Sequence, residues 1–420
     1  MVRWRIRQLA GLILMGIGAW LVVTTWPHSI AEPPASSVIA AATATLETPA
    51  PVASHTPTAI AATSTPTPTD MPTHTPTLTT TPTCTPSPQA TATRVPLGAA
   101  GPLITRIPTS SPASVVKSPV WQGRARFGLS GAVSPYAVEQ LGVGWYMNWL
   151  VSASPARPGG IEFAQTIRTP HGVLNLSVET IAAVARAAPG SLWLVGNEPD
   201  RIALQDDATP VQYAAAYYQA YEALKRADPT ALVAAGGIVQ PTPLRLRYLD
   251  AVLAAYQQLY GAPMPVDVWQ IHNYVLREER GSWGAEIPPG LSDRQGMLYE
   301  VDDSGNLEAW KAHIREFRRW MQERGYRDRP LIVSEYGIPM PPDYGFGPER
   351  VRSFLLETFD FLVSASDPAS GYPPDANRLV QRWCWFSVAD PIYLTGNLFD
   401  PKTREMTPLG QAWREYVSAH

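Results

Sequence analysis

From about residue 118 onward the chain contains eight short apolar runs, and segments with helical periodicity separate most of them. Runs of about four to eight apolar residues between turn signals are typical of fully buried strands. The runs predict strands at residues 126–130, 143–150, 160–168, 191–196, 231–239, 266–274, 330–335 and 382–388.

The segments between these strands predict helices, because their apolar residues recur every three or four positions. The predicted helices are 209–226, 307–324, 348–365 and 408–418. In the first of them Tyr213, Tyr217 and Tyr221 lie four positions apart, and Pro229 follows its end. Strands that alternate with helices imply parallel βαβ units. The roughly 300 residues of this region suit one (β/α)8 barrel, or TIM barrel, of the α/β class.

The connection between the second and third predicted strands is irregular. Residues 152–158 are too few and too rich in proline for a helix, so either that helix is missing or one of the strands is wrong. A doubly wound open sheet is the competing fold, and it would carry a Gly-rich phosphate loop after its first strand. No such loop follows residues 126–130, and the barrel is therefore the predicted fold.

The amino-terminal segment, residues 1–31, predicts export. Arg3, Arg5 and Arg7 precede an apolar run at residues 9–26, and basic residues stay on the cytoplasmic side of a membrane. The run is long for a signal-peptide core and short for a comfortable membrane span. An uncleaved signal anchor and a signal peptide cleaved near Ala31 therefore both remain open, and an extracellular protein, anchored to the membrane or secreted, is expected.

Residues 32–117 consist mainly of Thr, Pro, Ala and Ser. Such a segment buries too little apolar surface to offset its ordering entropy, so it predicts a disordered, extended linker. The same composition is found in O-glycosylated stalks and in unmodified linkers, and the sequence does not choose between them. Residues 118–420 form the predicted barrel domain.

Charge and cysteine content exclude several classes of protein. The chain has 33 basic and 36 acidic residues and a net charge of −3, which argues against nucleic acid as a partner. Cys84 lies in the linker and Cys384 in a predicted strand, so a disulfide between them is not expected. No CxxC pair or metal-spaced histidine cluster is present. We therefore expect no metal and no cofactor. A monomer is expected, although none of these features bears on the oligomeric state.

Two carboxylates follow predicted strands directly. Glu198 follows strand 191–196 and Glu335 ends strand 330–335. The carboxyl ends of barrel strands form the active-site mouth, where the fourth and seventh strands lie nearly opposite. Burial there is expected to raise the pKa of Glu198, which suits a general acid. Two facing carboxylates, one protonated and one ionised, are the catalytic groups of glycoside hydrolysis. The structural alternatives are a helix-start carboxylate for Glu198 and a buried ion pair for Glu335.

Other polar and aromatic residues are predicted to surround these carboxylates. His272 and Tyr274 share one face of the sixth strand and are placed to hydrogen-bond a nucleophilic carboxylate. Trp383 and Trp385 share one face of the eighth strand. Either could form the floor under a sugar ring or pack between barrel and helix, and Trp385 is the candidate for the floor. Residues 276–306, which include Trp283, form a long loop that would either wall the cleft or be a disordered insertion.

These motifs resemble a known clan. Asn197-Glu198-Pro199, His272-x-Tyr274, Ser334-Glu335-Tyr336-Gly337 and the aromatic eighth strand are similar to the retaining glycosidases with catalytic residues on strands four and seven. Within that clan, the second strand at residues 144–149 resembles the Asl1-like group, glycoside hydrolase family one hundred and twenty-eight. That group also lacks a regular helix between its second and third strands. Glycoside hydrolase family thirty-nine is the neighbouring possibility.

The resemblance implies roles for individual residues. Glu198 would be the acid/base, Glu335 the nucleophile, and Asn197 a partner of the sugar 2-hydroxyl, whereas the residues alone do not divide the roles between the two carboxylates. His272 and Tyr274 would support the nucleophile. The sequence departs from the clan where many members place an arginine on the second strand. Here that strand has Trp145, Asn148 and Trp149, of which the first two are candidate substrate-binding residues.

The expected function is therefore hydrolysis of a β-linked polysaccharide or oligosaccharide with retention. An inactive carbohydrate-binding protein on the same barrel is the alternative, because a fold does not guarantee activity. A metal-dependent hydrolase would need ligands on several strands, and His272 is the one histidine placed at a strand end. β-1,3-Glucan follows from the resemblance, and xylan-type and other polysaccharides remain open.

Overall fold

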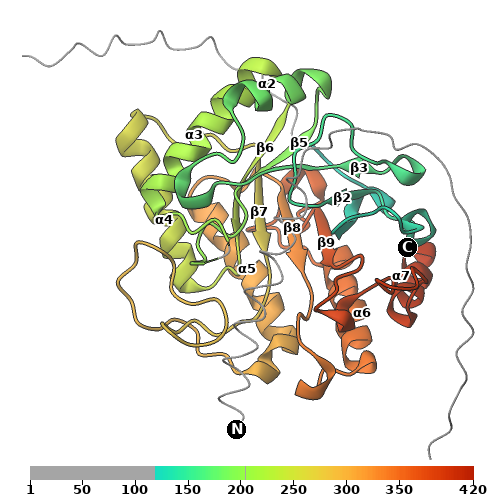
Figure 1. Ribbon diagram of the computed structural model, residues 1–420. Coiled ribbons are helices and arrows are strands. Elements are labelled where there is room, and N and C mark those ends of the chain that lie inside the picture. Colours follow the sequence, from blue (N-terminus) through green and yellow to red (C-terminus); the bar gives the residue numbers. More distant parts are fainter. Residues whose placement is uncertain (1–118, 204) are drawn as a thin grey trace, which may run out of the picture. The chain divides into compact units, whose positions relative to one another are not determined.

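The protein is described by a computed structural model over residues 119–203 and 205–420. Nine parallel strands form one sheet in the order β3-β2-β1-β9-β8-β7-β6-β5-β4 (Figure 1). The strands are β1 (Phe127–Ser130), β2 (Trp145–Met147), β3 (Glu162–Phe163), β4 (Gln165–Ile167), β5 (Leu192–Val195), β6 (Leu232–Ile238), β7 (Val268–His272), β8 (Leu331–Tyr336) and β9 (Arg382–Phe386).

The two edges of this sheet, β3 and β4, are separated only by Ala164. They are two halves of one chain segment, of which the first pairs with β2 and the second with β5. The sheet therefore closes into a barrel through the predicted third strand. All eight predicted strands are confirmed, and the open sheet is excluded.

Helices surround the strands (Figure 1). They are α2 (Val178–Ala187), α3 (Pro210–Ala227), α4 (Pro243–Tyr260), α5 (Leu307–Glu323), α6 (Pro348–Ser364) and α7 (Pro408–Ala419). Four of them match the predicted helices. A capping box between Thr209 and Gln212 begins α3, so both side chains bond backbone N–H groups that the first turn leaves unpaired. Helices α2 and α4 were not among the predicted segments.

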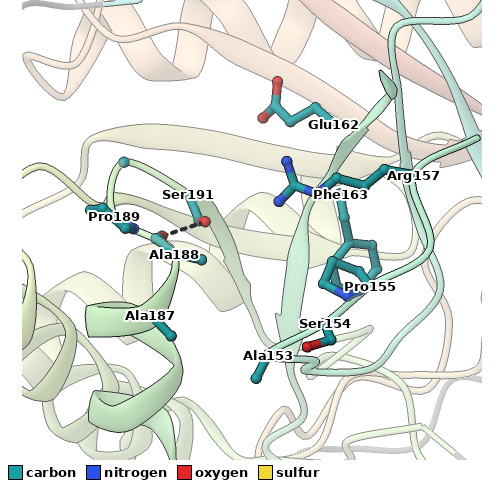
Figure 2. A pocket seen from close by; sticks show the side chains of 11 residues that line it. Ala153, Ser154, Pro155, Arg157, Glu162, Phe163, Ala187, Ala188, Pro189 and Ser191 are labelled. Carbon is teal, nitrogen blue, oxygen red and sulfur yellow. Dashed lines mark hydrogen bonds between the residues drawn. The ribbon is translucent and has the colours of Figure 1, made fainter. Parts of the chain in front are cut away.

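The irregular β2–β3 connection is confirmed, because only the short 3-10 turn Pro158–Gly160 interrupts it. The β1–β2 connection also lacks an α-helix, which the sequence pattern did not indicate. Beside the β2–β3 connection lies a hollow of about 450 Å³ between Arg157 and the end of α2 (Figure 2). Glu162 and Ser191 line it at the amino-terminal ends of their strands, so it lies at the opposite end of the barrel from the predicted site.

Side chains alternate between the barrel interior and the surrounding helices. Trp145, Leu194, Val268 and Cys384 belong to one interior cluster. Their strand neighbours belong to the larger core between sheet and helices, as Trp383 shows by packing against Phe359 of α6. This alternation decides which strand residues reach the mouth of the barrel.

Gly128 of β1 is a test of this interior packing. A Cβ there would lie 2.3 Å from Nε1 of Trp145 and 2.8 Å from Sγ of Cys384. We expect Gly128→Ala to lower the free energy of unfolding by about 1–3 kcal/mol, because an overpacked core must distort. Urea denaturation measures the loss. The double variant Gly128→Ala/Trp145→Phe should lose less than the sum of the two single variants, and strict additivity would contradict the predicted clash.

The predictions for residues 1–31 and 32–117 lie outside the described residues and stay predictions. Among residues 119–203 and 205–420, none of the helices combines the length and apolar character that a membrane span requires. The loop at residues 276–306 is ordered rather than a disordered insertion. A bridge between Glu279 and Gln295 and the turn Val301–Gly305 give it local structure.

Candidate active site

Glu198 and Glu335 meet at the carboxyl ends of the strands. Glu198 lies just beyond β5, and Glu335 lies near the end of β8. One ligand atom from each of Glu198, Glu335 and His272 lies within 4.8 Å of the other two, and all three residues are buried. The backbone of Glu198 has a φ of 47°, in a region that non-glycine residues seldom adopt and that is enriched at functional sites.

Two neutral donors hold Glu335. The hydroxyl of Tyr274 donates to Oε1 at 2.8 Å, and the indole Nε1 of Trp149 donates to Oε2 at 2.9 Å. Burial, with the nearby Glu198 charge, raises the pKa of Glu335 although His272 and the two donors oppose this effect. Tyr274 therefore lies where the sequence predicted. Trp149, noted in the sequence only as a departure from the clan, supplies the second donor.

Glu198 has a different environment. His272 Nδ1 lies 3.0 Å from its Oε1, and the Arg201 guanidinium Nη1 donates to its Oε2 at 3.1 Å. Burial alone would raise the pKa of Glu198, but the charge of Arg201 and the His272 hydrogen bond outweigh burial and hold that pKa below its usual range. The expectation of a raised pKa is therefore wrong. The missed partner stands three residues further along the chain, a spacing that was visible in the sequence.

His272 does not contact Glu335 as closely as the sequence predicted. Its Nδ1 lies 3.9 Å from Glu335 Oε1, beyond hydrogen-bonding distance, against 3.0 Å from Glu198. Burial lowers the pKa of His272, yet the charge of Glu335 and the hydrogen bond and charge of Glu198 raise it overall. His272 therefore lies between the two carboxylates and bonds to Glu198, whereas Tyr274 takes the position on Glu335.

Removal of the Trp149 donor tests the hold on Glu335. Trp149→Phe leaves a buried carboxylate oxygen without its donor, and a hydrogen bond to a charged group contributes about 1.5–3 kcal/mol. We expect the pKa of Glu335 to rise by about one to two units, measured by carbon-13 NMR of the glutamate carboxyl groups. Trp121→Phe, at the opposite end of the barrel near Arg382, is the control. An unchanged Glu335 titration would show that the indole donor is unimportant.

Trp385 is not the floor of the site, and this prediction is wrong. Its side chain is fully buried, its Nε1 donates to the Gly396 carbonyl at 2.8 Å, and its ring packs against Tyr336 and Phe354. Because side chains alternate along β9, Trp383 and Trp385 both face the helices. The residue that faces the mouth is Phe386, which no sequence prediction named.

Phe386 belongs to an aromatic wall beside Glu335. Its ring lies 6.2 Å from that of Trp149 and 5.9 Å from that of Tyr393, as measured between centroids. We call these three residues the aromatic wall. Phe386 and Trp149 are partly exposed. The rings meet edge to face, at 62° and 64°. The partly exposed rings of Phe386 and Trp149 therefore supply apolar surface next to a carboxylate, where one face of a sugar ring could pack.

The three remaining candidates differ in position. Trp145 is fully buried inside the barrel and donates to the Arg126 carbonyl at 3.3 Å, so it cannot contact a substrate, and that prediction is also wrong. Asn148 and Asn197 lie nearer the mouth, and the Oδ1 atom of each is buried without a hydrogen-bond partner. Buried acceptors without donors are unfavourable, so each of these oxygens is a candidate to accept a hydrogen bond from a ligand.

The loop at residues 276–306 is attached to the Glu198 segment through a buried arginine. Arg245, at the start of α4, is fully buried and forms ion pairs with Asp200 at 2.5 Å and Glu278 at 2.7 Å. It also donates to the backbone carbonyls of Ala285 and Glu286, each at 2.8 Å. This arginine therefore fixes the middle of the loop beside the turn that carries Glu198.

The group Glu198, His272 and Glu335 has the composition of a metal site. Its four carboxylate oxygens, however, already face donors from His272, Arg201, Tyr274 and Trp149. Arg201 is a permanent cation at this position. The donor set therefore fits an arrangement of carboxylates held by hydrogen bonds better than the coordination of a second cation.

No family model and no curated protein matches this chain. Solved structures do resemble it. One is a GH128 subgroup II endo-β-1,3-glucanase from Pseudomonas viridiflava, 19% identical over 70% of this chain and 98% of that chain, with a TM-score of 0.48. Another is a GH128 subgroup VII oligosaccharide-binding protein from Cryptococcus neoformans, 14% identical over 74% and 100%, with a TM-score of 0.44.

A GH39 β-xylosidase from Caulobacter crescentus is similar as well, 14% identical over 71% of this chain and 72% of that chain, with a TM-score of 0.46. The two glycoside hydrolase families that the sequence resembles are thus both represented among its structural neighbours. Identities of 19% or lower and TM-scores of 0.48 or lower carry no argument about activity, which depends on the side chains of the site.

Proposed function

We propose that this protein is a glycosidase that hydrolyses β-linked glycans with retention of anomeric configuration. The observation that carries the proposal is the pair of buried carboxylates from β5 and β8 whose oxygens approach within 4.8 Å. Retaining glycosidases place their carboxyl groups about 5–5.5 Å apart, whereas inverting enzymes leave about 6.5–9.5 Å for a water molecule. An approach within 4.8 Å by one oxygen from each carboxylate is compatible with the shorter, retaining range.

In the proposed reaction Glu335 is the nucleophile and Glu198 the acid/base. A Glu335 oxygen bonds to the anomeric carbon while the bond to the bridging oxygen breaks, and that oxygen takes a proton from Glu198. Water then attacks the anomeric carbon and gives a proton to Glu198. The bond between Glu335 and the sugar breaks, and its electron pair returns to Glu335 as a carboxylate.

The assignment of roles follows the resemblance of the two strand ends. The donors Tyr274 and Trp149 support it, because they stabilise the charge that returns to Glu335 when the ester breaks. In the free protein, however, Arg201 gives Glu198 the lower pKa of the pair. Glu198 can therefore act as an acid only after this ion pair opens.

The surroundings of the two carboxylates support a glycan ligand. The aromatic wall offers a stacking surface, and Asn148 and Asn197 offer acceptors without partners. In this proposal Asn197 accepts from the sugar 2-hydroxyl. β-1,3-Glucan is the first candidate substrate on the sequence resemblance, followed by xylan and other β-linked polysaccharides. Segment 1–31 would place the enzyme outside the cell, tethered to the membrane or secreted after cleavage.

The test is the release of reducing ends by the full chain from a panel of β-1,3-glucan, mixed β-glucan, xylan and mannan. Proton NMR of the first product would show the β-anomer if configuration is retained. An α-anomer would exclude the double displacement. If one glycan binds but none is cleaved, the carbohydrate-binding alternative is favoured. The observation that supports this alternative is the Arg201 guanidinium on Glu198 Oε2, because it opposes the acid form that cleavage requires.

A further inference from the structure

Both oxygens of Glu198 face nitrogen atoms. Oε1 lies 3.0 Å from His272 Nδ1, and Oε2 accepts from Arg201 Nη1 at 3.1 Å. A guanidinium has five donors and no acceptor, so the position of Oε2 that faces Arg201 cannot carry a proton. A proton on Oε1 would point at the imidazole. This arrangement favours the ionised form of Glu198, which has no proton to give to a glycosidic oxygen.

Arg201 is held weakly compared with the other arginine of the site. Its side chain is 19% exposed, and its second hydrogen bond, to the Gly284 carbonyl, is long at 3.4 Å. Arg245 is fully buried and has several short bonds. Arg245 fixes the loop at the residues next to Gly284, so the loop carbonyl is held in place independently of Arg201.

We propose that Arg201 is a positioning residue that keeps Glu198 in its ionised, proton-accepting form and leaves Oε2 when the bridging oxygen of a glycan occupies that place. This inference rests on the proposed function and assigns the regulation of the acid/base to a residue outside the carboxylate pair. Departure of the guanidinium removes a permanent cation from Oε2, so Glu198 gains a proton from solvent in the same event that positions the bond to be broken.

The second half of the reaction needs the opposite state. Once the bridging oxygen has taken its proton and the first product has left, Oε2 is again free for Arg201. The returning cation favours the carboxylate that accepts a proton from the attacking water. Arg201 thereby stabilises the ionised form of Glu198, which acts as the base. The substrate makes the protonated form accessible by displacing Arg201 from Oε2.

The groups that face Glu198 come from four segments. They are Asp200 and Arg201 beyond β5, His272 and Tyr274 on and just after β7, Glu335 on β8, and Tyr393 in the connection after β9. Of these, Arg201 is the cation that bonds Glu198 from its own turn. Loss of its charge should therefore raise the pKa of Glu198, while the other groups remain in place.

The first experiment uses the free full-length protein and carbon-13 NMR of its glutamate carboxyl groups. In Arg201→Met the Glu198 titration should move up by at least one pH unit, with a smaller shift in Arg201→Lys. The control is Arg247→Met, which removes an exposed arginine that pairs with Asp293 in the same loop region. An unchanged Glu198 titration in a folded Arg201→Met protein would overturn the proposal, whether or not any glycan is cleaved.

The second experiment compares two aryl β-glycosides across pH. For a poor leaving group, which needs protonation, the alkaline limb of kcat/KM should move to higher pH in Arg201→Met. A 2,4-dinitrophenyl leaving group needs no acid, so the alkaline limb of its kcat/KM should not move. The acidic limb of its kcat should move to higher pH, because activation of water needs ionised Glu198. Profiles that coincide with wild type would refute the role of Arg201. Absence of hydrolysis in wild type would refute the proposed function instead. The carboxyl titration would still show whether Arg201 lowers the pKa of Glu198.

Discussion

Glu335→Gln lowers the rate of glycan hydrolysis by about four orders of magnitude or more, because the amide cannot form the glycosyl ester that splits the reaction into two steps. The change replaces one oxygen by a nitrogen of similar size, so the fold should be retained. Initial rates of reducing-end release measure the loss. Glu279→Gln, an exposed glutamate in the loop at residues 276–306, is the matched control and should keep wild-type activity.

Azide rescue then separates the roles of the two carboxylates. With a 2,4-dinitrophenyl β-glycoside, Glu335→Gly should form the α-glycosyl azide, since azide takes the place of the missing nucleophile. Glu198→Ala should form the β-glycosyl azide through the intact glycosyl ester. Exchanged products would reverse the assignment, as the lower pKa of Glu198 in the free protein would suggest.

Arg245→Met should lower the free energy of unfolding by about 3–5 kcal/mol, the second large effect. Both partners, Asp200 and Glu278, are fully buried, and the loss of their shared cation leaves two uncompensated charges. The two loop carbonyls at Ala285 and Glu286 also lose their donor. Urea denaturation at neutral pH measures the difference.

The control for this variant lies on the same helix. Arg247→Met removes an exposed ion pair with Asp293 and should change stability by less than about 1 kcal/mol. The loss in Arg245→Met should shrink as pH falls, because burial raises the pKa of Asp200 and a protonated Asp200 needs no cation. A loss below about 1 kcal/mol at neutral pH would mean that the arginine does not hold the loop to the Glu198 segment.

The strands and the position of the two carboxylates could be predicted from the sequence for one physical reason. Strands of a parallel barrel are buried on both faces, so each reads as a continuous apolar run, and its carboxyl end lies at the mouth. Glu198 and Glu335 lie at the ends of such runs. The order of the strands was enough to predict that the two side chains face each other across the mouth. Tyr274 could be placed because it lies two residues from His272 in the predicted strand 266–274, although β7 itself ends at His272.

The same property of buried strands explains the errors. A run that is apolar on both faces does not show which face is inside, and the pairing of Trp383 with Trp385 on one face was therefore assigned to the wrong side of β9. Phe386 reaches the mouth instead. Trp145 does face inward, but it lies deep in the barrel, because the level of a residue within the barrel depends on the tilt and pairing of all strands.

The sequence by itself determined the barrel, its irregular β2–β3 unit and the two carboxylates at the mouth, because these follow from local patterns along the chain. Tertiary structure decided the electrostatics of the site. Arg201 folds back onto Glu198, Trp149 reaches Glu335 from just beyond β2, and Arg245 joins two segments far apart in sequence. Charges and donors act through space over a few ångströms, so the protonation of a carboxylate depends on neighbours that only the closed barrel brings together.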